Sequence, residues 1–262
     1  MSRALSEKKL KFALLGHDIG YSLSPKLHKS IFKKSGVFAE YSTFDVGRDE
    51  LSATVRLLEE EYDGFNITKP YKTDVFEMLS ERDTEVVLCG NVNVAYKGIG
   101  YNTDYRALLK IMRASKIPHN AGKALIFGSG ATARTTAVAL SSIGVQVTVV
   151  CRNQKEGYAI SDQLLSMGLP EISVIPLDLC LTCSSDIVVN TISSSFLEFP
   201  TINCRYAVNF NYGDRGMNFQ KQLQSRPVII TGEEILLQQV IETETIWLGK
   251  RIDLSWEETL NG

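Results

Sequence analysis

A glycine-rich turn in the middle of the chain has the residue types and spacing of a dinucleotide-binding loop. Residues 128–133 read GSGATA and fit the pattern G-x-G-x-x-G/A, after an apolar run at 124–127 and before a helical segment. Gly128 permits a tight turn, Gly130 lets the backbone approach a diphosphate, and Ala133 is small enough for close packing of helix on strand. Because the first N–H groups of a helix attract anions, this context favours a dinucleotide site over an ordinary glycine-rich turn.

A cation follows the next predicted strand, where NAD enzymes often carry an acid for the ribose 2′-hydroxyl. The strand spans 145–150 and is followed by Arg152, with Lys155 behind it. A planar guanidinium suits a 2′-phosphate and can stack on adenine. The sequence therefore favours NADP over NAD, and a solvated surface arginine is the alternative.

Polar side chains gather at the ends of predicted strands in the first half of the chain. The four clusters are Ser22 with Ser24, Asn66 and Thr68 with Lys72, Asn93, and Asn102 with Asp104. Ligands of open α/β sheets bind beyond the carboxyl ends of the strands, and hydroxyl and amide groups there suit a polyol. Plainer interpretations remain, since Ser24 and Asp104 could be helix N-caps only and Lys72 a solvated helix residue.

Strands and helices alternate along the chain, which predicts an α/β fold with parallel or mixed sheets. In the first half we expect strands at 11–16, 41–46, 63–68, 92–96 and 100–102, with helices at 25–34 and 51–61. In the second half we expect strands at 124–127, 145–150, 187–190, 207–210 and 228–231, with helices from the glycine turn through 140 and at 233–248. The elements thus form two successive alternating units.

The composition is that of folded domains without a nucleic-acid or membrane signature. The 262 residues are 44% hydrophobic, and 28 basic residues against 30 acidic ones give a net charge of -2. No apolar run approaches the roughly 18–20 residues of a membrane span, and the first eleven residues lack the apolar core of a secretory signal. We expect a cytoplasmic protein with a small-molecule substrate and no nucleic-acid or membrane partner.

Cysteine and histidine spacing gives little support for a metal site. The five cysteines are an odd number in a chain that is not short, so no disulfide framework is expected. Cys180 and Cys183 form one C-x-x-C, but no second pair completes a zinc site. The histidines, His17, His28 and His119, have no ligand spacing. We therefore predict no metal and disfavour a redox role for the C-x-x-C.

Several of these motifs together resemble the shikimate dehydrogenase family, in order and across nearly the whole chain. Residues 16–25 (GHDIGYSLSP) resemble G-N-P-I-x-H-S-L-S-P, and residues 65–72 (FNITKPYK) resemble F-N-V-T-I-P-H-K. The other matches are 92–93 (VN) with A-V-N-T, 100–104 (GYNTD) with G-x-N-T-D-G, 128–134 (GSGATAR) with G-A-G-G-A-x-R, 190–191 (NT) with N-A-T, and 232–239 (GEEILLQQ), with Trp247 and Gly249, with G-x-x-M-L-V-x-Q and L-W-x-G. The set is specific, although no single motif is.

The resemblance implies an NADP-dependent oxidoreductase that interconverts 3-dehydroshikimate and shikimate in chorismate and aromatic amino acid biosynthesis. It implies two α/β domains, with substrate and cofactor held on either side of a cleft that opens and closes. The substrate domain would comprise 1–104 plus 233–262, because the C-terminal helix returns to it. A Rossmann-type, doubly wound NADP domain would comprise 105–232.

The resemblance also implies roles for individual residues. Lys72 and Asp104 would be the catalytic pair. The substrate would be bound by Ser22, Ser24, Thr68, Asn93 and Gln239. The cofactor would be bound by Gly128, Ser129, Gly130, Ala131, Arg152, Asn153 and Thr191. Whether the protein is a monomer or a homodimer stays open.

Some residues depart from the family pattern and leave the substrate open. Tyr105 replaces the glycine after N-T-D, which would add bulk next to the carboxylate, and Phe210 aligns with a substrate-contacting tyrosine. A relative acting on quinate or another cyclic hydroxy acid is therefore an alternative. A non-catalytic NADP-binding sensor is an alternative of another class, although the presence of both Lys72 and Asp104 argues against it.

Overall fold

The computed structural model describes residues 8–262 except 116, 118–121, 194–197, 253–254 and 257–262. The described residues belong to two compact units. The first unit lies within Met1–Val87, Asn91–Thr103 and Gln239–Gly262, and the second within Leu88–Gly90 and Asp104–Gln238. The chain therefore leaves the first unit at Thr103 and returns to it at Gln239.

The first unit contains a mixed six-stranded sheet with the strand order β2-β1-β3-β5-β6-β4. The elements in chain order are β1 (Leu10–Gly16), α1 (Ser24–Lys34), β2 (Ala39–Asp45), η1 (Arg48–Glu50), α2 (Leu51–Glu61), β3 (Gly64–Ile67), α3 (Lys72–Met78), β4 (Glu81–Arg82), α4 (Thr84–Cys89), β5 (Val94–Tyr96) and β6 (Ile99–Tyr101). Strands β1, β2 and β3 are parallel, whereas β5 runs antiparallel to both β3 and β6. Lys97 and Gly98, both with positive φ, form the turn between β5 and β6.

The direction of β5 decides which polar residues share an edge of this sheet. Because β5 is antiparallel to β3, Asn93 before β5 lies at the edge where β3 ends. Strand β6 reverses direction again, so Asn102 after β6 lies at that same edge. The backbone N–H of Ile67 donates to the carbonyl of Asn93 at 2.8 Å, which joins the two strands there.

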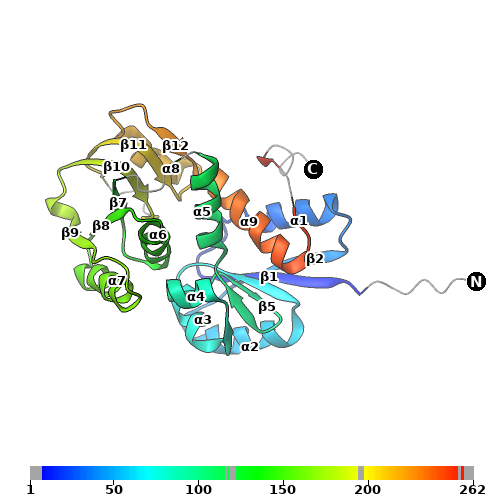
Figure 1. Ribbon diagram of the computed structural model, residues 1–262. Coiled ribbons are helices and arrows are strands. Elements are labelled where there is room, and N and C mark those ends of the chain that lie inside the picture. Colours follow the sequence, from blue (N-terminus) through cyan, green and yellow to red (C-terminus); the bar gives the residue numbers. More distant parts are fainter. Residues whose placement is uncertain (1–7, 116, 118–121, 194–197, 253–254, 257–262) are drawn as a thin grey trace, which may run out of the picture. The chain divides into compact units, whose positions relative to one another are not determined.

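The second unit contains a six-stranded parallel sheet with the order β12-β11-β10-β7-β8-β9, the arrangement of a doubly wound Rossmann-type domain (Figure 1). The elements that follow β6 in the chain are α5 (Thr103–Ala114), β7 (Lys123–Phe127), α6 (Ala131–Ser142), β8 (Gln146–Cys151), α7 (Gln154–Ser166), β9 (Ser173–Pro176), η2 (Leu177–Leu179), β10 (Thr182–Asn190), β11 (Thr201–Asn209), α8 (Asp214–Lys221), β12 (Val228–Ile230) and α9 (Gly232–Leu248). Helix α9 begins in this unit and ends in the first. None of the described helices is both long and apolar enough to cross a membrane.

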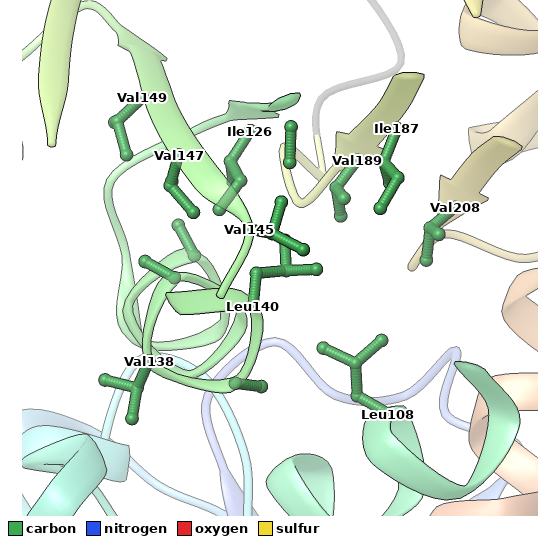
Figure 2. Close-up of a cluster of buried hydrophobic side chains, with 14 of the residues drawn as sticks. Leu108, Ile126, Val138, Leu140, Val145, Val147, Val149, Ile187, Val189 and Val208 are labelled. Atoms are coloured by element: carbon green, nitrogen blue, oxygen red, sulfur yellow. The ribbon is translucent and has the colours of Figure 1, made fainter. Parts of the chain in front are cut away.

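β-branched residues that alternate along the parallel strands build the core of the second unit. Figure 2 shows Val147 with Val149 of β8 and Ile187 with Val189 of β10 on one side of their strands, facing α6. Ala133 in the first turn of α6 is fully buried, so the helix packs closely on the sheet directly after the glycine turn. This packing fixes the turn against the strand ends.

The predicted fold class is confirmed, and the structure corrects several local predictions. The helix predicted at 51–61 has those bounds, and each predicted strand exists, although β10 and β11 begin earlier than predicted. Ser24 is not an N-cap, because Leu23 precedes the helix and Ser24 is its first residue. Asp104 is not an N-cap either, because it is the second residue of α5. Helices α3, α4, α5, α7 and α8 were not predicted as elements.

Candidate active site

Gly128 allows the chain to turn sharply at the end of β7. Its φ is +113°, a conformation that L side chains rarely adopt, and an added Cβ would lie 2.4 Å from Oγ1 of Thr191. The Thr191 hydroxyl in turn donates to the carbonyl of Phe127 at 2.7 Å. The ends of β7 and β10 are therefore joined directly beside the glycine turn.

A cavity of about 740 Å³ opens beside this turn, and Gly130 is one of the residues that line it. An added Cβ on Gly130 would meet no atom within 4 Å, so the backbone before α6 faces open space. The cavity is lined by Gly128, Ser129, Gly130, Cys151, Arg152, Asn153, Glu156, Thr191, Ile192 and Ser193. Its size and the exposed start of α6 fit a dinucleotide diphosphate.

Six of the seven predicted cofactor residues line this one cavity. They are Gly128, Ser129, Gly130, Arg152, Asn153 and Thr191. Ala131, the first residue of α6, is not among the lining residues. Asn153 also caps helix α7, because its side-chain oxygen accepts a hydrogen bond from the backbone N–H of Glu156. The structure thus brings the turn and the end of β8 together, while cofactor binding by these residues stays a prediction.

Glu156 lines the cavity as well and was missed by the sequence analysis. It lies in the first turn of α7, and its Oε2 accepts a hydrogen bond of 2.7 Å from the hydroxyl of Ser129. The sequence signal was present, because an acid three residues after an N-cap asparagine is typical of a helix start. That signal does not reveal that the carboxylate reaches the glycine turn.

Cys151, which lines the cavity, is buried and uncharged. Burial raises the pKa of the Cys151 thiol, hydrogen bonds from Ser129 and Gly157 oppose this shift, and the charge of Glu156 adds to it. The thiol therefore keeps its proton at neutral pH and does not add an anion to the cavity.

Hydroxyl groups lie at the carboxyl edge of the first sheet, where the substrate site is predicted. Thr68 directly follows β3, and its backbone N–H donates to the carbonyl of Leu15 in β1 at 2.9 Å. The backbone N–H of Ser22 donates to Ile19, and its hydroxyl accepts a hydrogen bond of 3.3 Å from the backbone of Ser24. Ser22, Ser24 and Thr68 are all half-buried. Their hydroxyls belong to the first unit, as the resemblance implies.

Asn93 is buried at this edge and is held by Thr103. Its Oδ1 accepts from the backbone N–H of Thr103 at 2.7 Å, and its Nδ2 donates to the Thr103 hydroxyl at 2.9 Å. The Thr103 hydroxyl also lies 3.3 Å from that of Thr243 in α9. The Thr243 hydroxyl donates to the carbonyl of Gln239 one turn earlier. Predicted substrate residues from the loop before β5 and from α9 thus share one hydrogen-bond network.

Lys72 and Asp104 each lie in the first turn of a helix that follows a strand of this sheet. Lys72 is the first residue of α3, is half-buried, and its carbonyl accepts from the backbone of Val92 at 3.0 Å. Asp104 follows Thr103 in the first turn of α5 and is only 2% exposed. A carboxylate this buried is not a solvated surface group. The action of the two residues as a pair stays a prediction.

Tyr105, which replaces the glycine of the family pattern, packs within the second unit. Its ring packs against the core of the second unit, and its hydroxyl lies 3.4 Å from that of Ser142 in α6. Phe210 packs against the same core. The bulk of Tyr105 is therefore taken up by the packing of α5 on α6.

A buried hydrogen bond between His28 and Glu244, which the sequence analysis did not detect, joins α9 to α1. The Nδ1 atom of His28 lies 2.5 Å from Oε1 of Glu244, and both side chains are almost fully buried. Burial raises the pKa of Glu244, and His28 partly offsets this. Trp247 in α9 stacks on Phe12 of β1 at 4.3 Å. These contacts hold the end of α9 in the first unit.

The described part of the chain contains no cluster of three or more metal-ligating side chains. His119 lies outside the described residues. The sulfurs of Cys180 and Cys183 are 2.7 Å apart, and both cysteines are free. Burial raises the pKa of Cys183 above its ordinary value, which disfavours a reactive thiolate there.

Comparisons with known proteins identify the family. The family model described as the shikimate dehydrogenase substrate binding domain matches residues 14–95. A shikimate dehydrogenase (NADP(+)) from Sulfolobus acidocaldarius is 32% identical, and a shikimate dehydrogenase from Sulfurisphaera tokodaii is 31% identical. Each match covers 95% of this chain and 92% of the relative. The chain belongs to the shikimate dehydrogenase family.

A solved structure supports the fold assignment. The shikimate 5-dehydrogenase of Thermus thermophilus, solved in complex with NADP(H) and shikimate, superimposes with a TM-score of 0.77 at 24% identity. The match covers 96% of this chain and 97% of that one. At this identity the likeness establishes the fold, a two-sheet α/β architecture.

Proposed function

We propose that the protein interconverts shikimate and 3-dehydroshikimate with NADP as the cofactor, in the biosynthesis of chorismate and aromatic amino acids. The observation that carries the proposal is the set of hydroxyl and amide groups at the carboxyl edge of the first sheet, in a member of this family. The relatives named above and the Thermus protein bear the names of shikimate dehydrogenases, and two of the three are named or solved with NADP. The polar edge suits a substrate with several hydroxyls.

Substrate recognition falls to the first unit in this proposal. Ser22, Ser24, Thr68, Asn93 and Gln239 bind the hydroxyls and the carboxylate of the substrate. Asn93 has its amide oriented by Thr103, so its position is set before the substrate arrives. A preoriented amide loses little conformational entropy on binding, which supports its role in recognition.

Cofactor recognition falls to the cavity beside the glycine turn. Gly128, Ser129, Gly130 and Ala131 hold the diphosphate at the start of α6, and Thr191 lies beside them. Arg152 and Asn153 hold the adenosine end, with the guanidinium directed to the 2′-phosphate. When bound, the nicotinamide supplies the hydride chemistry.

Lys72 and Asp104 handle the proton in this proposal. The reacting secondary hydroxyl loses its proton as the carbon is oxidised, and a lysine–carboxylate pair polarises that hydroxyl and takes up the proton. In the reverse direction the same pair returns the proton to the oxygen.

The predicted domain limits, 1–104 plus 233–262 and 105–232, belong to this proposal, as does a cytoplasmic location. Either a monomer or a homodimer is compatible with it. The limits matter because the predicted substrate residue Gln239 comes from the returning helix, far along the chain from Lys72.

The test is turnover of shikimate and of quinate, measured side by side through the absorbance of the reduced nicotinamide. We expect NADP-dependent oxidation of shikimate, with 3-dehydroshikimate as the product. Turnover of quinate alone would replace the substrate in the proposal with that of a paralogue. Tight NADP binding without turnover of either acid would favour the sensor and refute the enzyme.

A further inference from the structure

One carboxylate in the cofactor cavity has no place in the proposed recognition of NADP. Glu156 lines the cavity together with Arg152, and Ser129 donates a hydrogen bond of 2.7 Å to its Oε2. Ser129 belongs to the glycine turn and Glu156 to α7, so this contact connects the two sides of the nucleotide site. A group that faces the nucleotide influences which nucleotide is bound.

A plain structural explanation accounts for only part of this arrangement. An acid in the first turn of a helix is stabilised by the helix dipole, and at the third helical position it often reaches back to the N-cap backbone. Glu156 occupies that third position after Asn153. Its carboxylate, however, binds the hydroxyl of Ser129 in the turn after β7. The side chain is therefore directed toward the nucleotide site.

The charges around the cavity balance. Of the described residues that line it, Arg152 is the one cation and Glu156 is the one anion, so the lining has no net formal charge. A phosphate monoester carries about 1.5–2 negative charges at neutral pH. Arg152 attracts such a group and Glu156 repels it. A ribose hydroxyl, in contrast, can donate a hydrogen bond to a carboxylate.

We propose that Glu156 is a cofactor-selectivity residue that opposes the 2′-phosphate and accepts a hydrogen bond from the ribose of an unphosphorylated nucleotide. This inference rests on the proposed function, and it names a second determinant of the cofactor at the same site. Arg152 and Glu156 act in opposite directions, so the preference for NADP over NAD is smaller than Arg152 alone would give. Removing the charge of Glu156 widens that preference.

The substitution Glu156→Gln isolates the charge. Glutamine has the same length, and its carbonyl oxygen can accept the hydrogen bond from Ser129. Asp162→Asn is the matched control, because Asp162 is an exposed acid on the same helix that does not line the cavity. Each variant removes one negative charge from α7, but only Glu156→Gln removes a charge from the nucleotide site.

The experiment measures the dissociation constants of 2′,5′-ADP and 5′-ADP with the full-length protein by calorimetry. For Glu156→Gln we expect 2′,5′-ADP to bind about fivefold more tightly. This is the size of the interaction between two exposed charges, here the carboxylate and the 2′-phosphate. We expect the affinity for 5′-ADP to stay the same or fall. Asp162→Asn should leave both constants near those of the wild type. An unchanged ratio of the two constants in Glu156→Gln would overturn the inference.

Salt dependence separates a charge effect from a change of shape. The difference between the wild type and Glu156→Gln in binding 2′,5′-ADP should shrink between about 50 mM and about 500 mM salt, because exposed charges are screened. A difference that does not depend on salt would also overturn the inference. If the wild type binds neither nucleotide, the proposed function fails together with the inference. If the wild type binds NADP and Glu156→Gln does not change the ratio of the dissociation constants of 2′,5′-ADP and 5′-ADP, only the inference fails.

Discussion

The side-chain amide of Asn93 binds Thr103 twice, accepting from its backbone N–H at 2.7 Å and donating to its hydroxyl at 2.9 Å. Thr103 is the first residue of α5 and directly precedes Asp104. The amide therefore orients the start of the helix that carries the proposed catalytic carboxylate. A residue predicted to bind substrate is at the same time a structural support for its neighbour.

The Thr103 hydroxyl should contribute measurably to stability. Thr103→Val keeps the shape of the side chain but removes the partner of Asn93 Nδ2 and of the Thr243 hydroxyl. We expect the free energy of unfolding to fall by about 1–3 kcal/mol, the cost of losing a buried hydrogen-bond partner. Urea denaturation measures this. Thr103→Ser keeps the hydroxyl and should lose less, and equal losses in both variants would show that the methyl group matters instead.

The two glycines of the turn should respond differently to alanine. Gly128→Ala places a Cβ 2.4 Å from Thr191 Oγ1 at a φ of +113°, so we expect a lower melting temperature. Gly130→Ala places its Cβ in open space, so we expect near-normal stability. If the diphosphate approaches Gly130 closely, this variant should nevertheless bind NADP more weakly. Thermal melting and calorimetric titration of both variants test this, and normal NADP affinity in Gly130→Ala would contradict the placement of the diphosphate.

Arg152 should distinguish the two cofactors. Arg152→Ala removes the cation of the cavity, and we expect the KM for NADP to rise roughly 10- to 100-fold, as for the loss of a charge-assisted hydrogen bond. The KM for NAD should change little, because NAD lacks the 2′-phosphate. Steady-state kinetics with both cofactors provide the measurement. Lys155→Ala is the control, since Lys155 does not line the cavity, and an equal effect on both cofactors would place Arg152 elsewhere on the nucleotide.

Local sequence patterns were sufficient for most strands and for the glycine turn. The helix at 51–61 has apolar residues at helical spacing, and the structure has the predicted limits. The turn at 128–133 contains Gly128, whose positive φ favours glycine, and it has a strand before it and a helix after it. Each of these features depends on neighbours in the chain, so one sequence reveals them.

Long-range contacts were not predictable in the same way. Ser129 meets Glu156 across 27 residues and His28 meets Glu244 across 216, and neither pair has a local signal. The edge position of Asn93 depends on β5 running antiparallel, which its short apolar segment does not encode. The N-cap interpretation of Asp104 was wrong because the helix already begins at Thr103, which makes Asp104 its second residue. Packing and strand direction, which a single sequence does not express locally, decide all of these features.

The central claim is that Lys72 and Asp104 act as one catalytic unit on shikimate. The most direct measurement is kcat for NADP-dependent shikimate oxidation by the wild type, Lys72→Met, Asp104→Asn and the double variant. Each single variant should lose roughly 10²–10⁴-fold in kcat, the usual contribution of a general acid–base group. The double variant should be hardly slower than the slower single one, because residues that act as a unit lose activity non-additively. Near-normal kcat in Asp104→Asn, or losses that multiply in the double variant, would contradict the account.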